Sequence, residues 1–326
     1  MVSARKTLGA IILIFSLDAS LMAAPKGRFE LRGLVVFVPP QDEGNRRATV
    51  RLTGTTEPYF AETRTDPKGN FRFGNLLPRS YDLTVTLPTG VVARQTVEVT
   101  PSFASAKGIV SINVKVERDR PPNMASTHVT VSVRELSIPD AAWDEYARAK
   151  ADLEKYNVEA ATRHLEKAVA QAPQFVEALN LLGTICFQTQ QYAQAEKYFR
   201  QALAHDPNAF APLVNLGGTL LSLRRIEEAL PVNQKAVAAQ PDDVLANAQL
   251  GMCYLALKNY DEARKYLEKA QALDPGHFTC PQLPLAEIYE HQGAKAEAIR
   301  ELQDFLARHP DSPRAGEVRE KIRRLQ

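Results

Sequence analysis

Apolar and polar residues alternate along several segments in the first half of the chain. Residues 81–87, 110–116 and 129–133 place an apolar side chain at every second position. Alternation with a period of two is typical of strands that bury one face and leave the other in water. Shorter candidate strands lie between turn signals at residues 34–38, 48–52, 60–64, 70–73 and 92–99. Short strands at this spacing predict a small antiparallel β-sandwich over residues 28–117.

A different period governs the second half of the chain. Five times a proline follows an alanine by twelve residues, and successive pairs are 34 or 35 residues apart. The alanines are Ala161, Ala195, Ala229, Ala263 and Ala298, and the prolines are Pro173, Pro207, Pro241, Pro275 and Pro310. This period predicts stacked helix pairs that form a solenoid. We therefore expect a multidomain β + α chain, with about five helical repeats over residues 141–310 and a capping helix over residues 311–326.

The sharpest local signal in the β region is a turn at residues 65–73, Thr-Asp-Pro-Lys-Gly-Asn-Phe-Arg-Phe. Pro67 sets φ for a turn, and Gly69 accepts the positive φ with which the chain re-enters a strand. Leu-Leu-Pro and then Tyr81 follow shortly afterwards. This stretch resembles the carboxypeptidase regulatory-like domain, a small transthyretin-like sandwich, although Arg79 and Ser80 stand where that family has a glycine. The resemblance implies a structural or adhesive module without catalytic residues.

The helical repeats resemble the tetratricopeptide repeat at nearly every diagnostic position. Gly183, Gly217 and Gly251 lie in the middle of three successive first helices, and the repeated alanines lie in the second helices. Small residues at these positions let the two helices of a repeat approach closely, and the proline ends the second helix. One unit of 34 residues cannot bury its own apolar face, so stacking of several units supplies the core.

Departures from the repeat pattern predict local irregularities. In repeat three, Asn233 replaces the usual large apolar residue and Pro231 lies inside the second helix, so we expect a kink or a packing defect there. Pro281 and Pro284 predict a late start for the first helix of repeat five. We expect the first helix of the solenoid to begin after Pro139, with Asp140 as its N-cap.

The tetratricopeptide resemblance also implies a concave groove, lined by the first helix of each repeat, that holds a peptide or a helix of a partner protein. The candidate groove residues are Asn180, Thr184, Phe187, Val214, Asn215, Gly218, Leu221, Ala248, Gln249, Met252, Leu255 and Glu287. They are mostly apolar or small, and they lack the Lys, Arg and Asn set with which some relatives clamp a C-terminal carboxylate. An apolar segment fits them better than an acidic tail. For Val214, Leu245 and Leu255, packing against neighbouring helices is an equal alternative.

The first 24 residues predict a secretory signal. Arg5 and Lys6 precede an apolar run over residues 8–17, and small residues follow near Ala23. Because the run is too short to span a bilayer comfortably, we expect cleavage, export to the periplasm or the medium, and no stable membrane insertion. An uncleaved anchor is the alternative. Between sandwich and solenoid, residues 118–140 predict a linker that contains one further strand at 128–136.

Composition and motifs predict no catalysis. The net charge is +2 without a basic patch, which excludes a nucleic-acid partner, and the three cysteines fit small buried residues. The six histidines form no metal or catalytic motif, so we expect no metal, cofactor or enzymatic activity. The leading hypothesis is a protein–protein interaction scaffold of the bacterial envelope. The alternative is a carbohydrate-associated envelope protein whose sandwich binds glycan through Tyr59, Phe60 and Phe103, with the repeats as a spacer.

Overall fold

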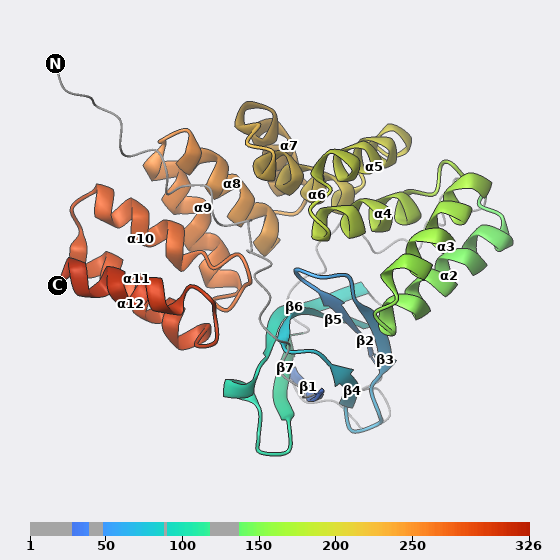
Figure 1. The fold of residues 1–326 in the computed structure, drawn as a ribbon, viewed down its shortest axis with the longest axis horizontal. Coiled ribbons are helices and arrows are strands. Elements are labelled where there is room, and N and C mark those ends of the chain that lie inside the picture. The colour runs from blue at the N-terminus through green and yellow to red at the C-terminus, as the bar shows by residue number, and fades with distance from the viewer. Residues whose placement is uncertain (1–27, 39–47, 88–89, 118–136) are drawn as a thin grey trace.

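The chain folds into a β-sandwich followed by a helical solenoid, as the two sequence periods predict. A computed structural model describes residues 28–38, 48–87, 90–117 and 137–326 (Figure 1). Within these residues, seven strands precede eleven α-helices. The expected signal sequence and the expected strand at 128–136 lie outside the described residues. No described helix has the length and apolar character needed to cross a membrane.

Two sheets form the sandwich. One has the strand order β4-β1-β7 and the other has the order β3-β2-β5-β6. The bounds are β1 Phe29–Val38, β2 Thr49–Gly54, β3 Phe60–Arg64, β4 Asn70–Leu76, β5 Arg79–Leu87, β6 Gly90–Val99 and β7 Ile109–Glu117. The pairing of β1 with β7 is parallel, which departs from the antiparallel sandwich expected from the sequence. Alternation reports which residues face the core and carries no information on strand direction.

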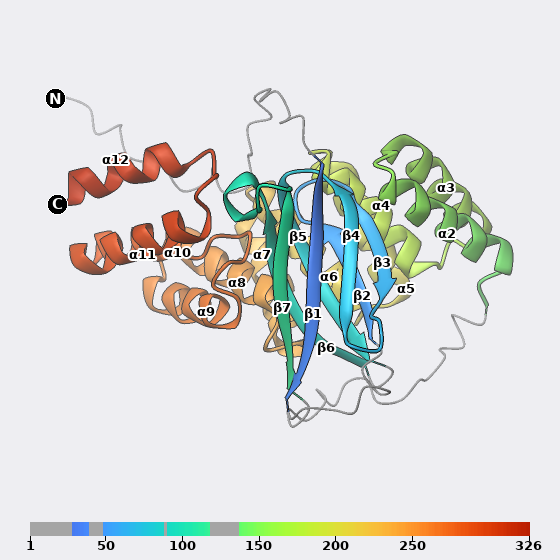
Figure 2. The same cartoon turned by 90° about the horizontal axis from the view of Figure 1, so that it is seen from below.

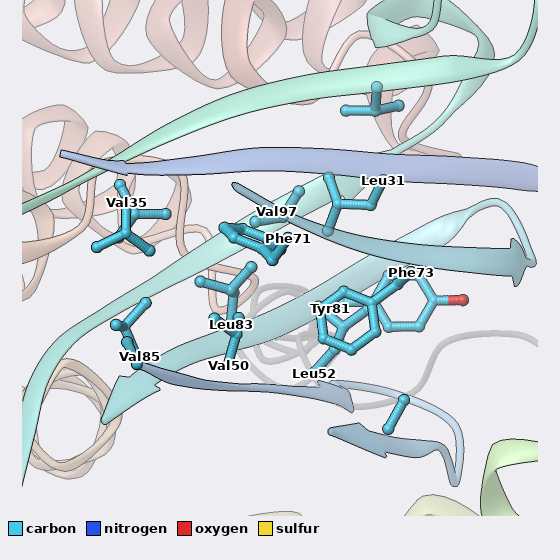
Figure 3. Close-up of a cluster of buried hydrophobic side chains, with 14 of the residues drawn as sticks. Leu31, Val35, Val50, Leu52, Phe71, Phe73, Tyr81, Leu83, Val85 and Val97 are labelled. Atoms are coloured by element: carbon cyan, nitrogen blue, oxygen red, sulfur yellow. The ribbon is translucent and has the colours of Figure 1, made fainter. Parts of the chain in front are cut away.

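The core of the sandwich follows the alternating pattern of its strands. Leu31, Val50 and Leu83 are fully buried between the two sheets (Figure 3). Phe71 and Phe73 point to the same buried face, as the turn sequence predicts, with ring centroids 6.0 Å apart. The turn before them is held by Asp66, whose carboxylate accepts hydrogen bonds from the backbone amides of residues 68 and 70 at 2.9 and 2.8 Å.

Helices pair and stack in the second half of the chain. Their bounds are α2 Asp140–Glu154, α3 Val158–Gln171, α4 Val176–Gln188, α5 Tyr192–His205, α6 Phe210–Ser222, α7 Ile226–Ala239, α8 Val244–Ala256, α9 Tyr260–Leu273, α10 Gln282–His291, α11 Lys295–Arg308 and α12 Ala315–Leu325. Close approach explains the glycines: a Cβ on Gly183 would lie 2.5 Å from the Phe199 ring. Pro139 is the N-cap residue of α2, so the expectation that Asp140 caps this helix is wrong; Asp140 is its first residue.

Repeat three carries the expected irregularity in its second helix. Helix α7 runs continuously through Pro231, whose side chain is exposed. Asn233 is fully buried, and its amide nitrogen donates to Cys253 Sγ at 3.3 Å. The Asn233 Oδ1 atom is buried, and no described residue donates a hydrogen bond to it. The irregularity is therefore a buried polar group and not an interruption of the helix. In repeat five, α10 starts late, at Gln282, as the two prolines predict.

The solenoid curves around the sandwich, which lies on its concave side (Figure 1). The sheet β3-β2-β5-β6 faces the helices, and the sheet β4-β1-β7 is turned away from them (Figure 2). The polar positions of β5 are consequently half-buried. Alternation alone would leave these positions in water. The sandwich contacts both ends of the arc formed by the repeats.

Candidate partner-binding surface

The predicted groove residues lie on the first helices of repeats two to five, α4, α6, α8 and α10. None of the twelve is fully exposed. Half-buried members are Asn180, Thr184, Phe187, Asn215, Met252 and Glu287, and buried members are Val214, Gly218, Leu221, Ala248, Gln249 and Leu255. The buried set follows from direct packing of neighbouring first helices, which leaves less open surface than the repeat positions suggest.

Contacts between first helices explain this burial. Asn215 on α6 donates to Asn180 Oδ1 on α4 at 3.0 Å and to Thr184 Oγ1 at 3.3 Å. Between α6 and α8, a Cβ on Gly218 would lie 2.5 Å from the Gln249 amide nitrogen. Val214 and Leu255, at 4% and 1% exposure, pack in the cores between helices, which agrees with the packing alternative for these two residues.

A pocket of about 300 Å³ opens where the loops before α4 and α6 lie side by side. Apolar parts of its wall come from Ile138, Val176, Phe210, Ala211 and Pro212, and polar parts from Gln174, Glu177, Asn180 and Asp206. Asn180 belongs to the predicted groove, and its side-chain oxygen is held by Asn215. The pocket thus joins the start of the groove to the inter-repeat loops.

Sequence reasoning missed most of the pocket wall. Ile138 precedes the first repeat, and Gln174, Asp206 and Phe210 lie in or beside the loops between repeats. Groove positions counted along each first helix do not include these loops. The spacing of the repeats could still have found them, because the loops before α4 and α6 occupy equivalent places in adjacent units.

The C-terminal end of the groove, which carries Glu287, is partly closed by the capping helix. Burial raises the pKa of Glu287, and the nearby charges of Lys321 and His291 oppose this shift. Lys321 on α12 lies 2.5 Å from the carboxylate of the neighbouring Glu290 on α10. The C-terminal end of the groove therefore offers less uncompensated negative charge than its sequence suggests.

At the N-terminal end of the arc, the sandwich is held mainly by aromatic side chains, which we call the aromatic attachment. Tyr156, in the turn between α2 and α3, stacks on Tyr59 with a centroid distance of 4.8 Å. Its hydroxyl lies 3.1 Å from that of Tyr81. Phe60 on β3 lies 4.9 Å beneath the Lys150 ammonium of α2. Tyr59 and Phe60 are thus engaged with the solenoid and do not form an exposed glycan platform with Phe103.

At the C-terminal end, strand β6 and the segment after it meet the loops between repeats, in what we call the polar attachment. Arg94 pairs with Asp243 at 3.2 Å, and the Thr96 backbone amide donates to Asp274 Oδ2 at 2.9 Å. Ser102 donates to Asp311 from its hydroxyl at 2.8 Å and its backbone amide at 3.2 Å. Glu98 lies 3.3 Å from His309 Nδ1. The sandwich therefore spans the concave side of the solenoid and contacts the solenoid near both of its ends.

Family models identify the helical part. Residues 176–209, 214–278 and 254–322 each match a model of the tetratricopeptide repeat. The helical part of the chain is built of tetratricopeptide repeats. A search among curated proteins finds no sequence match.

Several solved structures resemble the tetratricopeptide solenoid. A fragment of MamA from Desulfovibrio magneticus RS-1 is 22% identical, with a TM-score of 0.48, over 54% of this chain and 99% of that chain. TTC0263, a thermophilic tetratricopeptide protein of Thermus thermophilus, is 22% identical, with a TM-score of 0.45, over 57% and 98%. PilW, described as a widely conserved type IV pilus biogenesis factor, is 23% identical, with a TM-score of 0.47, over 52% and 78%.

Proposed function

We propose that the chain is a non-catalytic protein-interaction scaffold that binds a peptide segment or a helix of a partner on the concave side of its repeats. The observation that carries this proposal is the pocket at the start of α4 and α6, which combines an apolar wall with the oriented Asn180 amide. A pocket with apolar walls and few polar groups suits a peptide that inserts an apolar side chain and forms a backbone hydrogen bond with an amide in the pocket.

The composition of the groove narrows the partner. The groove positions are mostly apolar or small, and they lack the cations that clamp a terminal carboxylate. We therefore propose a segment with an apolar anchor side chain and not an acidic tail.

Selection of peptides by the full chain tests the proposal. A random peptide library displayed on phage is selected against the folded protein, and the best peptide is titrated by calorimetry. Ala211 is an exposed residue in the pocket wall, so Ala211→Trp should fill the pocket and weaken the selected peptide at least about tenfold. The matched control is Ala193→Trp, because Ala193 is exposed and is also the second residue of its helix, α5.

Two outcomes would count against this assignment. One is a selection that enriches no sequence over a blank surface, and the other is a selected peptide that binds the Ala211 and Ala193 variants equally well. Circular dichroism of each variant checks that the solenoid remains folded.

We further propose that the scaffold acts in the bacterial envelope after export. What supports this is the N-terminal sequence pattern, with Arg5 and Lys6 before a short apolar run. Cell fractionation of a tagged chain, with the mass of the mature protein, tests both export and cleavage near Ala23. A protein recovered in the cytoplasm with its first residues intact would overturn the localisation while leaving peptide binding to be judged separately.

A further inference from the structure

Strand β6 is an edge strand that contacts the solenoid through Arg94, Thr96 and Glu98. It ends the sheet β3-β2-β5-β6 and pairs only with β5 within that sheet. The Thr96 amide points away from β5 and donates to Asp274 in the loop after α9. An edge amide of this kind is otherwise open to water or to another strand. Its protection therefore depends on the contact between sandwich and solenoid.

The carboxylate of Asp82 lies next to the contact between Thr96 and Asp274. Asp82 on β5 is paired in register with Thr96, whose hydroxyl lies 3.4 Å from Asp82 Oδ1. The other charged groups that face Asp82 are Arg94 on β6, and Asp274 and Asp243 from the solenoid. Burial and the negative charge of Asp274 raise the pKa of Asp82 to about 7. Burial also raises the pKa of Asp243, so among the described residues Arg94 is the cation that balances more than one carboxylate.

A histidine completes the same attachment. His309 is 5% exposed and lies between Glu98 on β6 and Cys280 in the loop before α10. Burial lowers the pKa of His309, but the neighbouring Cys280 and Glu98 side chains outweigh burial and raise it to about 10. The neighbouring His277 has its pKa lowered to about 3 by burial and by the charge of His309, so it stays neutral. The cation on His309 thus holds the Glu98 carboxylate of the sandwich.

The aromatic attachment differs in its response to pH. Burial raises the pKa of Tyr59 and Tyr81, so both rings stay neutral through the physiological range. Gln188 adds a neutral hydrogen bond to the Gly54 carbonyl at 2.9 Å. Charge therefore controls one end of the sandwich and aromatic packing holds the other.

We propose that the sandwich pivots on the aromatic attachment and is released from the C-terminal repeats as the pH rises, which opens the concave side of the solenoid. The inference concerns the conformation of the chain and does not depend on the identity of a partner.

The sign of the effect follows from proton linkage. A carboxyl whose pKa is raised in the docked state favours docking when protonated, and this contribution is lost as the pH rises from about 4 to the docked pKa near 7. A histidine whose pKa is raised in the docked state also favours docking when protonated, and its contribution is lost from about 6.5 to the docked pKa near 10. The two groups act in the same direction, in pH ranges that overlap only between about 6.5 and 7.

Exchange of the Thr96 amide with solvent, measured by NMR on the full chain and corrected for intrinsic pH dependence, reports the release. We expect its protection factor to fall on the order of tenfold between pH 5 and 7 and again between pH 7 and 9. Leu83 in the central strand β5 serves as a reference amide for global unfolding. Asp82→Asn should remove the first fall, and His309→Gln should remove the second. Asp144→Asn, an exposed aspartate on α2, should change neither.

A disulfide-locked variant tests whether the loss of Thr96 amide protection reports movement of the sandwich. Ser102 and Asp311 are in side-chain contact, so a disulfide in Ser102→Cys with Asp311→Cys should hold the polar attachment closed, and both falls should disappear until it is reduced. The proposal is overturned if protection of Thr96 is constant in the native chain, if the oxidised locked variant shows the same falls, or if Leu83 loses protection in parallel. It is also overturned if Asp82→Asn and His309→Gln leave both falls unchanged.

Discussion

At the scale of single residues, the repeats depend on a small residue of the first helix facing a large one of the second. Gly183 faces Phe199 and Gly251 faces Leu267, where an added Cβ would lie 2.5 and 2.7 Å from the facing side chain. In repeat three the same position holds Asn233 against Gly217. The buried Asn233 Oδ1 atom, to which no described residue donates a hydrogen bond, weakens this unit relative to its neighbours.

We therefore expect Asn233→Leu to stabilise the protein by about 1–3 kcal/mol, because it removes the unpartnered Asn233 Oδ1 and fills the same space with apolar atoms. The measurement is the midpoint of urea unfolding followed by circular dichroism. The reverse change at the equivalent site, Leu267→Asn, should lower the midpoint. A stability loss in Asn233→Leu would show that the hydrogen bond to Cys253 outweighs the unpartnered oxygen.

At the scale of elements, α12 closes the open end of the solenoid. Its Val318 is 2% exposed and packs in the cluster of buried residues that includes Leu302 and Phe305, with Ile322 and Leu325 beside them. The sequence predicts this capping helix over residues 311–326. Without such a cap, the last repeat would leave an apolar face in water.

Val318→Asp should destabilise the C-terminal repeat by about 2–4 kcal/mol, since it removes buried apolar surface and places a carboxylate in the cluster. Hydrogen exchange read by mass spectrometry should show faster exchange in α10 and α11. Arg319→Asp changes the exposed neighbour and should leave exchange in these helices unaltered. Equal effects of both changes would mean that α12 does not cap the solenoid through Val318.

Element positions were predictable because each depends on local periodicity. The turn that begins at Thr65, the late start of α10 and the helix pairs follow from residues close together in the sequence. The parallel pairing of β1 with β7 did not follow, because these strands are separated by most of the sandwich. Alternation along β5 predicted that Asp82 is exposed to solvent. This prediction missed its burial, because the residues that cover it come from loops far along the chain, around Asp243 and Asp274.

At the scale of the whole molecule, the sandwich and the repeats form one closed arrangement that the sequence did not predict. The groove positions came from the repeat pattern, but their accessibility depends on how strongly the solenoid curves and on what lies inside its curve (Figure 1). Neither the curvature nor what lies inside it can be predicted from residues close together in the sequence, since contacts such as Glu98 with His309 join residues 211 positions apart. The pocket at α4 and α6 depends in the same way on two loops brought together by stacking.

The aromatic attachment should couple the unfolding of the two parts of the chain. Tyr156 stacks on Tyr59 and its hydroxyl meets that of Tyr81, so Tyr156→Ala should remove about 2 kcal/mol of coupling between sandwich and solenoid. Calorimetry should then resolve two unfolding transitions where the native chain shows more closely overlapping ones. Lys258→Ala is the matched control, because Lys258 is exposed and has the same left-handed backbone, φ 60° against 59°, in the corresponding turn of repeat four. If both variants unfold as the native chain does, the sandwich is not held through Tyr156, and the pivot proposed for its release must lie elsewhere.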